Sequence, residues 1–152
     1  MECCSCKSNS GEKRISPGVP IYLGKYWRVE HSYPTGLEGW LVIVLNRHCE
    51  ALHELSLEEW KELYQIQYHS IRVLYEMFST KKEYLCCFAE MDGFEHIHFH
   101  VIPKSNRYNE EWKGFKAFQY LKMDKEKNIS EDRIKEICTI LAKHFSEGML
   151  SF

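Results

Sequence analysis

Three histidines alternate with apolar residues between positions 96 and 102, where the sequence reads HIHFHVI. Successive side chains of a β-strand point to opposite faces, so we expect His96, His98 and His100 to share one face. A row of neutral imidazoles can bind a catalytic zinc ion and leave one coordination position for water. Alternatively, one imidazole nitrogen can attack phosphorus while the other nitrogen of that ring is held by a hydrogen-bond partner. The alternation therefore indicates a functional site, and both kinds of chemistry remain open.

The seven cysteines lie in two kinds of surroundings. Cys86, Cys87 and Cys138 fall in apolar stretches and are expected to be small buried side chains. Cys3 and Cys6 lie where no hydrophobic periodicity exists, and Cys-x-x-Cys has the spacing of half a zinc site. Because seven is an odd number and the N-terminus shows no basic-then-apolar export signal, we expect reduced thiols.

The elements that must position these residues follow from hydrophobic periodicity and turn signals. Residues 40–45 form a continuous apolar run, which predicts a strand buried on both faces. Ser56 and Glu59 have the spacing of a capping box, which predicts the start of a long amphipathic helix that ends near Ser79. Ser130 is expected to cap a last helix. Strands, helix, strands and helix in this order predict an α+β fold on an antiparallel sheet. The other expected elements are strands over 21–23, 26–29, 84–91 and 96–102 (the last closed by Pro103), a short helical segment within 112–121, and irregular chain over 1–20.

Composition narrows the class of protein. The chain has 152 residues, a formal charge of -2 and 44% hydrophobic residues, which suits a single domain over residues 1–152. The near-neutral charge argues against a dedicated nucleic-acid binder, which is usually basic. No apolar run approaches the roughly 18 residues of a membrane span. A cytoplasmic protein without a membrane partner is therefore expected.

The histidine motif resembles the signature of the histidine triad (HIT) superfamily of nucleotide hydrolases and transferases. Upstream, residues 39–44 (GWLVIV) followed by Arg47 and His48 are similar to the family's Gly-His segment, and residues 54–56 lead into a helix that resembles its central helix. The similarity covers roughly residues 3–103. It implies a HIT-like fold with an antiparallel sheet of about five strands, a long central helix and a C-terminal helix, and a homodimer as is usual in the family.

The resemblance also implies a mechanism. His98 would attack the α-phosphate of a nucleotide and form a covalent nucleotidyl-histidine, which water would hydrolyse to a nucleoside monophosphate. His100 would bind the phosphate or supply a proton near it. The uridylyltransferase branch carries Gln at the third histidine position, so His100 favours hydrolysis over transfer. Dinucleoside polyphosphates and nucleoside phosphoramidates are the two candidate substrate classes.

Some bacterial-type HIT proteins carry a zinc ion, and this chain is similar to them at all four ligand positions. The implied ligands are Cys3, Cys6, His48 and His96, with Cys4 as a rival. A closed Cys₂His₂ set would make the zinc structural and would remove His96 from catalysis. The expected N-terminus over residues 1–20 is then a zinc-binding segment, and residues 104–152 are a C-terminal helical extension.

The chain departs from the family pattern near the expected substrate. Trp40 stands where family hydrolases commonly have His, and the loop before the triad is short. Ser32 lies near the position of a ribose-binding residue, and Glu90 lies near the missing phosphate loop, so these residues and Trp40 are the substrate-binding candidates. Two alternatives to the hydrolase follow: a nucleotide-binding protein with weak turnover, and a metallohydrolase that uses all three histidines.

Overall fold

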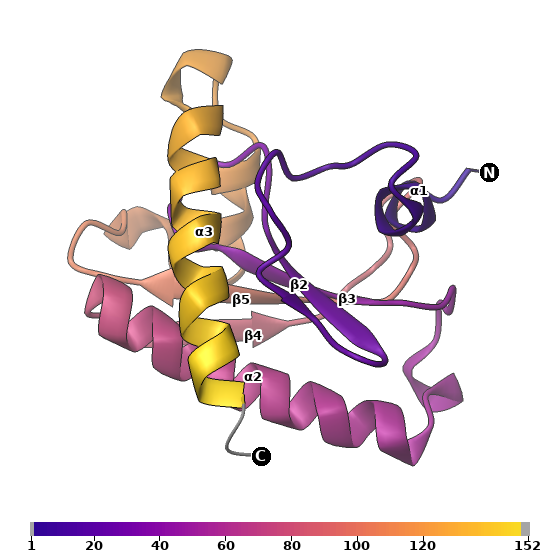
Figure 1. The fold of residues 1–152 in the computed structure, drawn as a ribbon. Coiled ribbons are helices and arrows are strands. Elements are labelled where there is room, and N and C mark those ends of the chain that lie inside the picture. Colours follow the sequence, from indigo (N-terminus) through magenta and orange to yellow (C-terminus); the bar gives the residue numbers. More distant parts are fainter. Residues whose placement is uncertain (1, 150–152) are drawn as a thin grey trace.

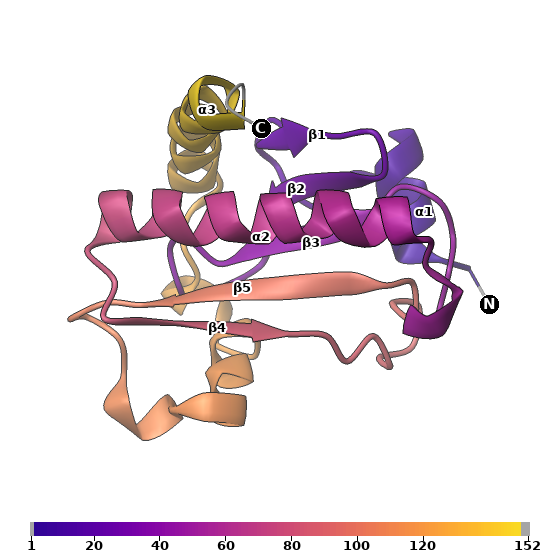
Figure 2. The same ribbon diagram turned by 90° about the horizontal axis from the view of Figure 1, so that it is seen from below.

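The computed structural model describes residues 2–149, which form a five-stranded antiparallel sheet with two long helices on one face (Figure 1). The strands lie in the order β1-β2-β3-β5-β4, so β5 lies between β3 and β4. Figure 2 shows α2 crossing the sheet with α3 beside it, near β1. The α+β fold with five strands that the sequence predicts is confirmed. The strands are β1 (Tyr22–Leu23), β2 (Trp27–His31), β3 (Leu41–Leu45), β4 (Lys82–Cys86) and β5 (His98–Lys104).

Several strand boundaries differ from the sequence prediction. The strand expected over 26–29 extends to His31, and the one expected over 96–102 begins only at His98. The strand expected over 84–91 ends at Cys86, and the backbone turns at Ala89, which has a positive φ of 49°. The strand expected to close at Pro103 continues to Lys104. Proline is tolerated there because β3 pairs with β5 only as far as Val101, so no second neighbour needs the missing N–H.

Helices α2 (Leu57–Phe78) and α3 (Glu131–Gly148) begin at the caps that the sequence predicts. The Ser56 hydroxyl accepts a hydrogen bond from the Glu59 amide, and the Glu59 carboxylate accepts one from the Ser56 amide. Both helices place an apolar face on the sheet and on each other, and this contact forms the main core. Its largest fully buried members include Trp27, Leu41, Ile43, Leu45, Leu63, Ile66, Leu74, Ile134 and Phe145.

The N-terminal segment corrects the prediction of irregular chain, because it contains α1 (Cys4–Ser10). Cys3 caps this helix, and its sulfur accepts a hydrogen bond from the Cys6 amide. Gly11 ends it in the left-handed conformation with a φ of 83°. The Cys4 amide donates to the Gly93 carbonyl at 2.9 Å, so α1 lies against the loop that precedes β5. The helix buries few apolar residues, so the sequence carries no periodic signal for it.

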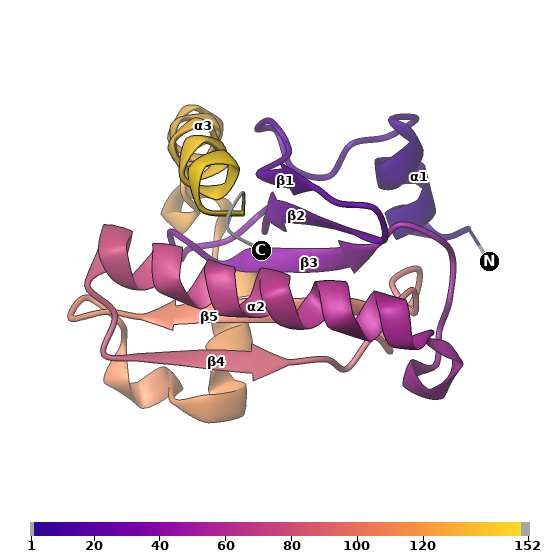
Figure 3. The same ribbon diagram turned by 60° about the horizontal axis from the view of Figure 1, so that its bottom comes forward.

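The other face of the sheet is partly covered by the segment between β5 and α3. Figure 3 shows this segment on the side of the sheet away from α2. It packs a second, smaller core around Trp40 and Ile102. The short 3-10 helices of the chain are η1 (Leu52–Glu54), η2 (Glu110–Trp112), η3 (Gly114–Leu121) and η4 (Lys125–Lys127). Within residues 2–149, no helix is long and apolar enough to cross a membrane.

Candidate functional site

His98 and His100 lie on the face of the sheet opposite α2. The β3–β5 register pairs His98 with Val44 and His100 with Val42, so both imidazoles stand beside small apolar side chains. Phe99 and Val101 point to the opposite face, where Val101 is fully buried in the main core. His96 lies before the first residue of β5, and its ring does not share the face of His98 and His100. The expected row of three histidines is therefore a pair, with His96 apart from it.

His98 has a defined hydrogen-bonding arrangement. Its Nδ1 lies 2.7 Å from the backbone carbonyl oxygen of His96. A carbonyl oxygen only accepts, so Nδ1 carries the hydrogen and Nε2 keeps a lone pair. Burial lowers the pKa of His98, which favours the neutral ring. Because His98 also lines a cavity, this ring is suited to act as a nucleophile or acceptor.

His100 is more deeply buried and contacts aromatic rings. Its Nδ1 accepts a hydrogen bond of 3.0 Å from the indole Nε1–H of Trp40. The Phe118 ring packs edge-on against it with centroids 5.0 Å apart, and the His98 ring does so at the same distance. Burial, and to a lesser degree the neighbouring His98, lowers the pKa of His100 to about 3. His100 is therefore neutral at pH 7.

The cavity in front of the two histidines has a volume of about 670 Å³ and largely apolar walls. Ser32 and Glu90, two of the expected substrate-binding residues, line it. Trp40, the third, does not: its side chain is fully buried behind His100. Trp40 therefore contacts His100 and does not face the cavity that a substrate would enter. The aromatic part of the wall comes from Tyr33, Phe88, Phe94, Phe115 and Phe118.

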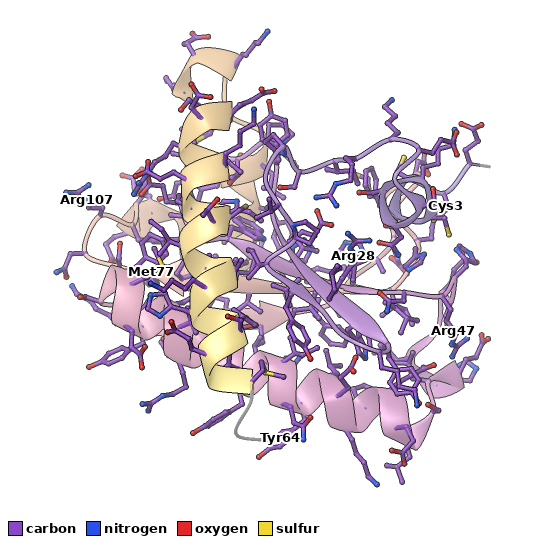
Figure 4. All side chains as sticks on the ribbon, viewed as in Figure 1. Cys3, Arg28, Arg47, Tyr64, Met77 and Arg107 are labelled. Carbon is purple, nitrogen blue, oxygen red and sulfur yellow. The ribbon has the colours of Figure 1, made fainter. Side chains whose placement is uncertain are left out.

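The sequence prediction missed a charged cluster on the pocket face of β2. Arg28 Nη2 lies 2.9 Å from Glu30 Oε1, and Arg14 Nη2 lies 3.3 Å from Glu30 Oε2. Arg28 also donates to the Asn9 carbonyl, so the cluster ties the N-terminal segment to the sheet (Arg28 is labelled in Figure 4). The sequence signal for this cluster is the pair of charged residues Arg28 and Glu30, which occupy alternate positions of one strand and so share a face.

Cys3, Cys6, His48 and His96 converge at one end of the sheet. Their ligand atoms all lie within 4.8 Å of one another. Cys3 Sγ is 3.6 Å from His96 Nδ1, and Cys6 Sγ is 3.5 Å from that same atom and 3.4 Å from His48 Nδ1. A tetrahedral zinc ion with Zn–S of about 2.3 Å and Zn–N of about 2.05 Å sets sulfur and nitrogen about 3.6 Å apart. The four residues therefore fit a zinc ion.

The surroundings of the four residues support the same conclusion. His96 Nε2 lies 2.7 Å from the Leu45 carbonyl oxygen, and His48 Nε2 lies 3.8 Å from the Glu50 carboxylate. Such contacts orient histidine ligands so that the other ring nitrogen faces the metal. Burial, with a smaller contribution from Cys3, raises the pKa of Cys6, so a nearby cation would favour its thiolate form. Figure 4 shows Cys3 beside α1, at the end of the sheet where β3 ends.

These four are the one cluster of metal-ligating residues in the part of the chain that the structure describes, and Cys4 is outside it. His98 and His100 are outside it as well. His96 turns its Nδ1 to the cysteines and its Nε2 to a backbone carbonyl, so the three histidines do not converge on one point. This geometry argues against a metallohydrolase that uses all three.

Comparisons with known proteins agree with this fold. No protein-family model and no curated protein matches the sequence. Among solved structures, a zinc-bound histidine triad family protein from Mycobacterium smegmatis superposes with a TM-score of 0.68 at 14% identity, covering 97% of each chain. A HIT-like protein from Bartonella henselae gives 0.66 at 12% identity, covering 91% of this chain and 92% of that one. A diadenosine triphosphate hydrolase from Plasmodium falciparum gives 0.63 at 13%, covering 85% and 77%. The chain therefore has the fold of the histidine triad proteins.

Proposed function

We propose that the protein is a HIT-type hydrolase that cleaves a nucleotidyl bond through a covalent intermediate on His98. The observation that carries this proposal is the contact between His98 Nδ1 and the His96 carbonyl, which leaves the Nε2 lone pair on the cavity side. The fold shared with a diadenosine triphosphate hydrolase supports the reaction class.

The reaction has two steps. In the first, His98 Nε2 forms a bond to the α-phosphorus, and the bond from phosphorus to the leaving group breaks with its electron pair on that group. In the second, water attacks the same phosphorus, the bond to Nε2 breaks with its electron pair returning to Nε2, and one proton of the water leaves to solvent. Splitting one displacement into two lowers each barrier, and a hydrogen bond from His100 offsets the charge on the phosphoryl oxygens.

The cavity is suited to a nucleoside next to this phosphate. Its aromatic walls offer stacking and apolar surface to a base, while Ser32 and Glu90 supply polar groups for the sugar or for phosphate-side contacts. The overall charge of -2 supports a small nucleotide rather than a nucleic-acid polymer as the partner.

Zinc bound by Cys3, Cys6, His48 and His96 would be structural, because four protein ligands complete a tetrahedron. When bound, it supplies a cross-link between the N-terminal segment and the residue before β5. His96 is also the residue whose carbonyl orients His98, so this cross-link supports the nucleophile through the backbone. Reduced cysteines at such a site suit the cytoplasmic location that we propose.

A second copy of the chain is the partner that we propose. Strand β4 lies at the edge of the sheet with Leu85 exposed, and an open edge is a template for further pairing. The outer face of α2 exposes Trp60, Tyr64 and Tyr75, and Figure 4 shows Tyr64 projecting away from the sheet. Light scattering should give about twice the chain mass of 18.2 kDa, and Tyr64→Lys should lower it. A single-chain mass at every concentration would contradict the dimer.

The hydrolase proposal is tested by a screen over dinucleoside polyphosphates and nucleoside phosphoramidates. The wild type should release a nucleoside monophosphate from at least one class. His98→Ala should lower kcat/KM by at least about a thousandfold, since removal of a nucleophile has effects of that order. His53→Ala, on an exposed turn of η1, is the matched control and should keep full activity.

The second candidate function is a nucleotide-binding protein with poor turnover. The observation that favours it is Trp40, which fills a site where family hydrolases commonly place a histidine. Nucleotide binding by calorimetry without hydrolysis of any compound in the screen would support this alternative over the hydrolase.

A further inference from the structure

Trp40 is placed to act on the reaction without touching the substrate. The side chain is fully buried in the smaller core, where its ring packs edge-on against Phe118 with centroids 5.3 Å apart. Its polar contact is with His100, whose Nδ1 lies 3.0 Å from the indole nitrogen. It is absent from the cavity wall.

This contact fixes the hydrogen positions on His100. An indole nitrogen carries a hydrogen and cannot accept, so His100 Nδ1 must present its lone pair. A neutral imidazole carries one hydrogen, which is then on Nε2. Protonation of Nδ1 would turn two N–H groups toward each other in a buried site, where neither could find another partner.

The two cavity histidines therefore have opposite tautomers. His98 carries hydrogen on Nδ1 and a lone pair on Nε2, whereas His100 has the reverse. Their rings lie 5.0 Å apart at 77°. A phosphoryl group at this position meets a lone pair that can attack phosphorus and an N–H that can donate to an oxygen.

We propose that Trp40 is a positioning residue that keeps His100 neutral with hydrogen on Nε2, which makes the site selective for phosphoric anhydrides over phosphoramidates. The proposal rests on the proposed function and names its substrate class. A neutral His100 donates a hydrogen bond to the phosphoryl group but delivers no proton to a leaving group.

Leaving-group chemistry gives the selectivity. When His98 Nε2 bonds to the α-phosphorus of an anhydride, the bridging P–O bond breaks, and its electron pair departs on a phosphate oxygen. That anion is stable near pH 7, because the second pKa of a phosphate monoester is about 6. When the P–N bond of a phosphoramidate breaks, the pair departs on an amine nitrogen, which must receive a proton during departure.

The groups next to the His100 ring include no carboxyl or amino group that could act as the acid. His98, Trp40 and Phe118 contact its ring, and Cys86 faces it from β4. Burial lowers the pKa of His100 to about 3, in agreement with a neutral ring. Of the carboxyl groups on the cavity wall, Glu30 is engaged by two arginines, and it is separated from His100 by Val42 in the strand register. The remaining titratable residues on the wall are His31, Tyr33 and Glu90, with Lys122 as a cation.

The first test is nitrogen NMR of the His100 side chain in the wild-type protein, with the signal assigned by its loss in His100→Gln. Between pH 5 and 8, we expect a protonated Nε2 and an unprotonated Nδ1 with no titration. A hydrogen on Nδ1, or titration within this range, overturns the proposal. This result does not depend on turnover, so it separates failure of the tautomer from failure of the hydrolase function.

The second test is the ratio of kcat/KM for a dinucleoside polyphosphate to that for a nucleoside phosphoramidate. The wild type should favour the anhydride by at least tenfold. Trp40→Phe should reduce this ratio by at least tenfold, because His100 Nδ1 is then no longer restricted to its unprotonated form. Trp27→Phe is the matched control, because Trp27 is equally buried and its indole donates to the Glu59 carbonyl instead. An unchanged ratio in Trp40→Phe, or an equal change in Trp27→Phe, overturns the proposal.

Discussion

Individual histidines in this chain differ in which ring nitrogen carries the hydrogen, because different backbone groups and rings surround them. His31 is the clearest case besides His98 and His100. It is 1% exposed, its Nδ1 lies 2.8 Å from the Ser32 carbonyl, and its Nε2 accepts from the Gly39 amide at 2.9 Å. These contacts hold one neutral tautomer in place, and they join the end of β2 to the start of β3.

His31 leads to a prediction about stability and pH. Burial lowers its pKa in the folded protein to about 4 from an ordinary value of 6.5. The unfolded chain therefore binds more protons between these values, so the stabilisation is complete above pH 6.5 and is lost as the pH falls toward 4. Between pH 7.5 and 5 this residue should account for about 2 kcal/mol of the loss in unfolding free energy.

Urea denaturation of the wild type and His31→Gln at both pH values measures this contribution. The variant should be less stable at pH 7.5, but its stability should fall by about 2 kcal/mol less on going to pH 5. Parallel losses in the two proteins would show that His31 does not carry the pH dependence.

Among the helices and strands, the sequence predicted the features that follow from local residue patterns. It missed those that depend on how the strands pair. The strand β3 and the caps at Ser56 and Ser130 follow from hydrophobic runs and capping residues, and the structure confirms them. The prediction that β3 is buried on both faces was wrong, because Val42 and Val44 are only half-buried and line the cavity. The apolar run after Tyr84 could not show that the backbone leaves the sheet before Ala89. The contact of Trp40 with His100 was also beyond prediction, because it depends on strand register and on how η3 closes the other face.

The candidate metal ligands were predicted as a set only through the resemblance to zinc-carrying HIT proteins. From spacing alone, Cys3 and Cys6 formed half a site, and nothing local connected them to His48 or His96. The structure brings the four together because α1 lies against the loop before β5. The sulfur of Cys4, the rival candidate, lies outside this cluster.

The zinc proposal predicts that Cys6→Ser loses the metal and much of the stability of the N-terminal segment. The wild type should contain about one zinc per chain, and Cys6→Ser should contain almost none. Binding to the folded state alone contributes about 4 kcal/mol when free zinc exceeds its dissociation constant a thousandfold. Elemental analysis together with thermal unfolding measures both effects.

Cys4→Ser and His98→Ala are the controls for this experiment, because both residues lie outside the ligand cluster. Each should retain one zinc per chain. Loss of the metal from His98→Ala would contradict a structural site and would favour the metallohydrolase.

The two faces of the sheet differ: one packs against the long helices, and the other lines the cavity. The main core packs α2 and α3 against one side of the sheet. The pairing of β2, β3 and β5 then sets the positions of the side chains on the other side. The N-terminal segment closes one end of the cavity through Ser5, Ser8 and Asn9, and the Cys/His cluster anchors that segment. We therefore predict that His98 alone forms the covalent bond, with every other element positioning it or its substrate.

Trapping of the intermediate shows whether His98 is the residue that bonds to the nucleotide. Wild-type protein mixed with a dinucleoside polyphosphate should be quenched within one turnover in denaturant at alkaline pH, since a phosphorus–nitrogen bond is labile in acid. We predict an intact mass increased by one nucleotidyl group, peptide mapping that places it on His98, and its absence in His98→Ala. Hydrolysis that proceeds without an adduct, or with an adduct on another residue, would contradict the account.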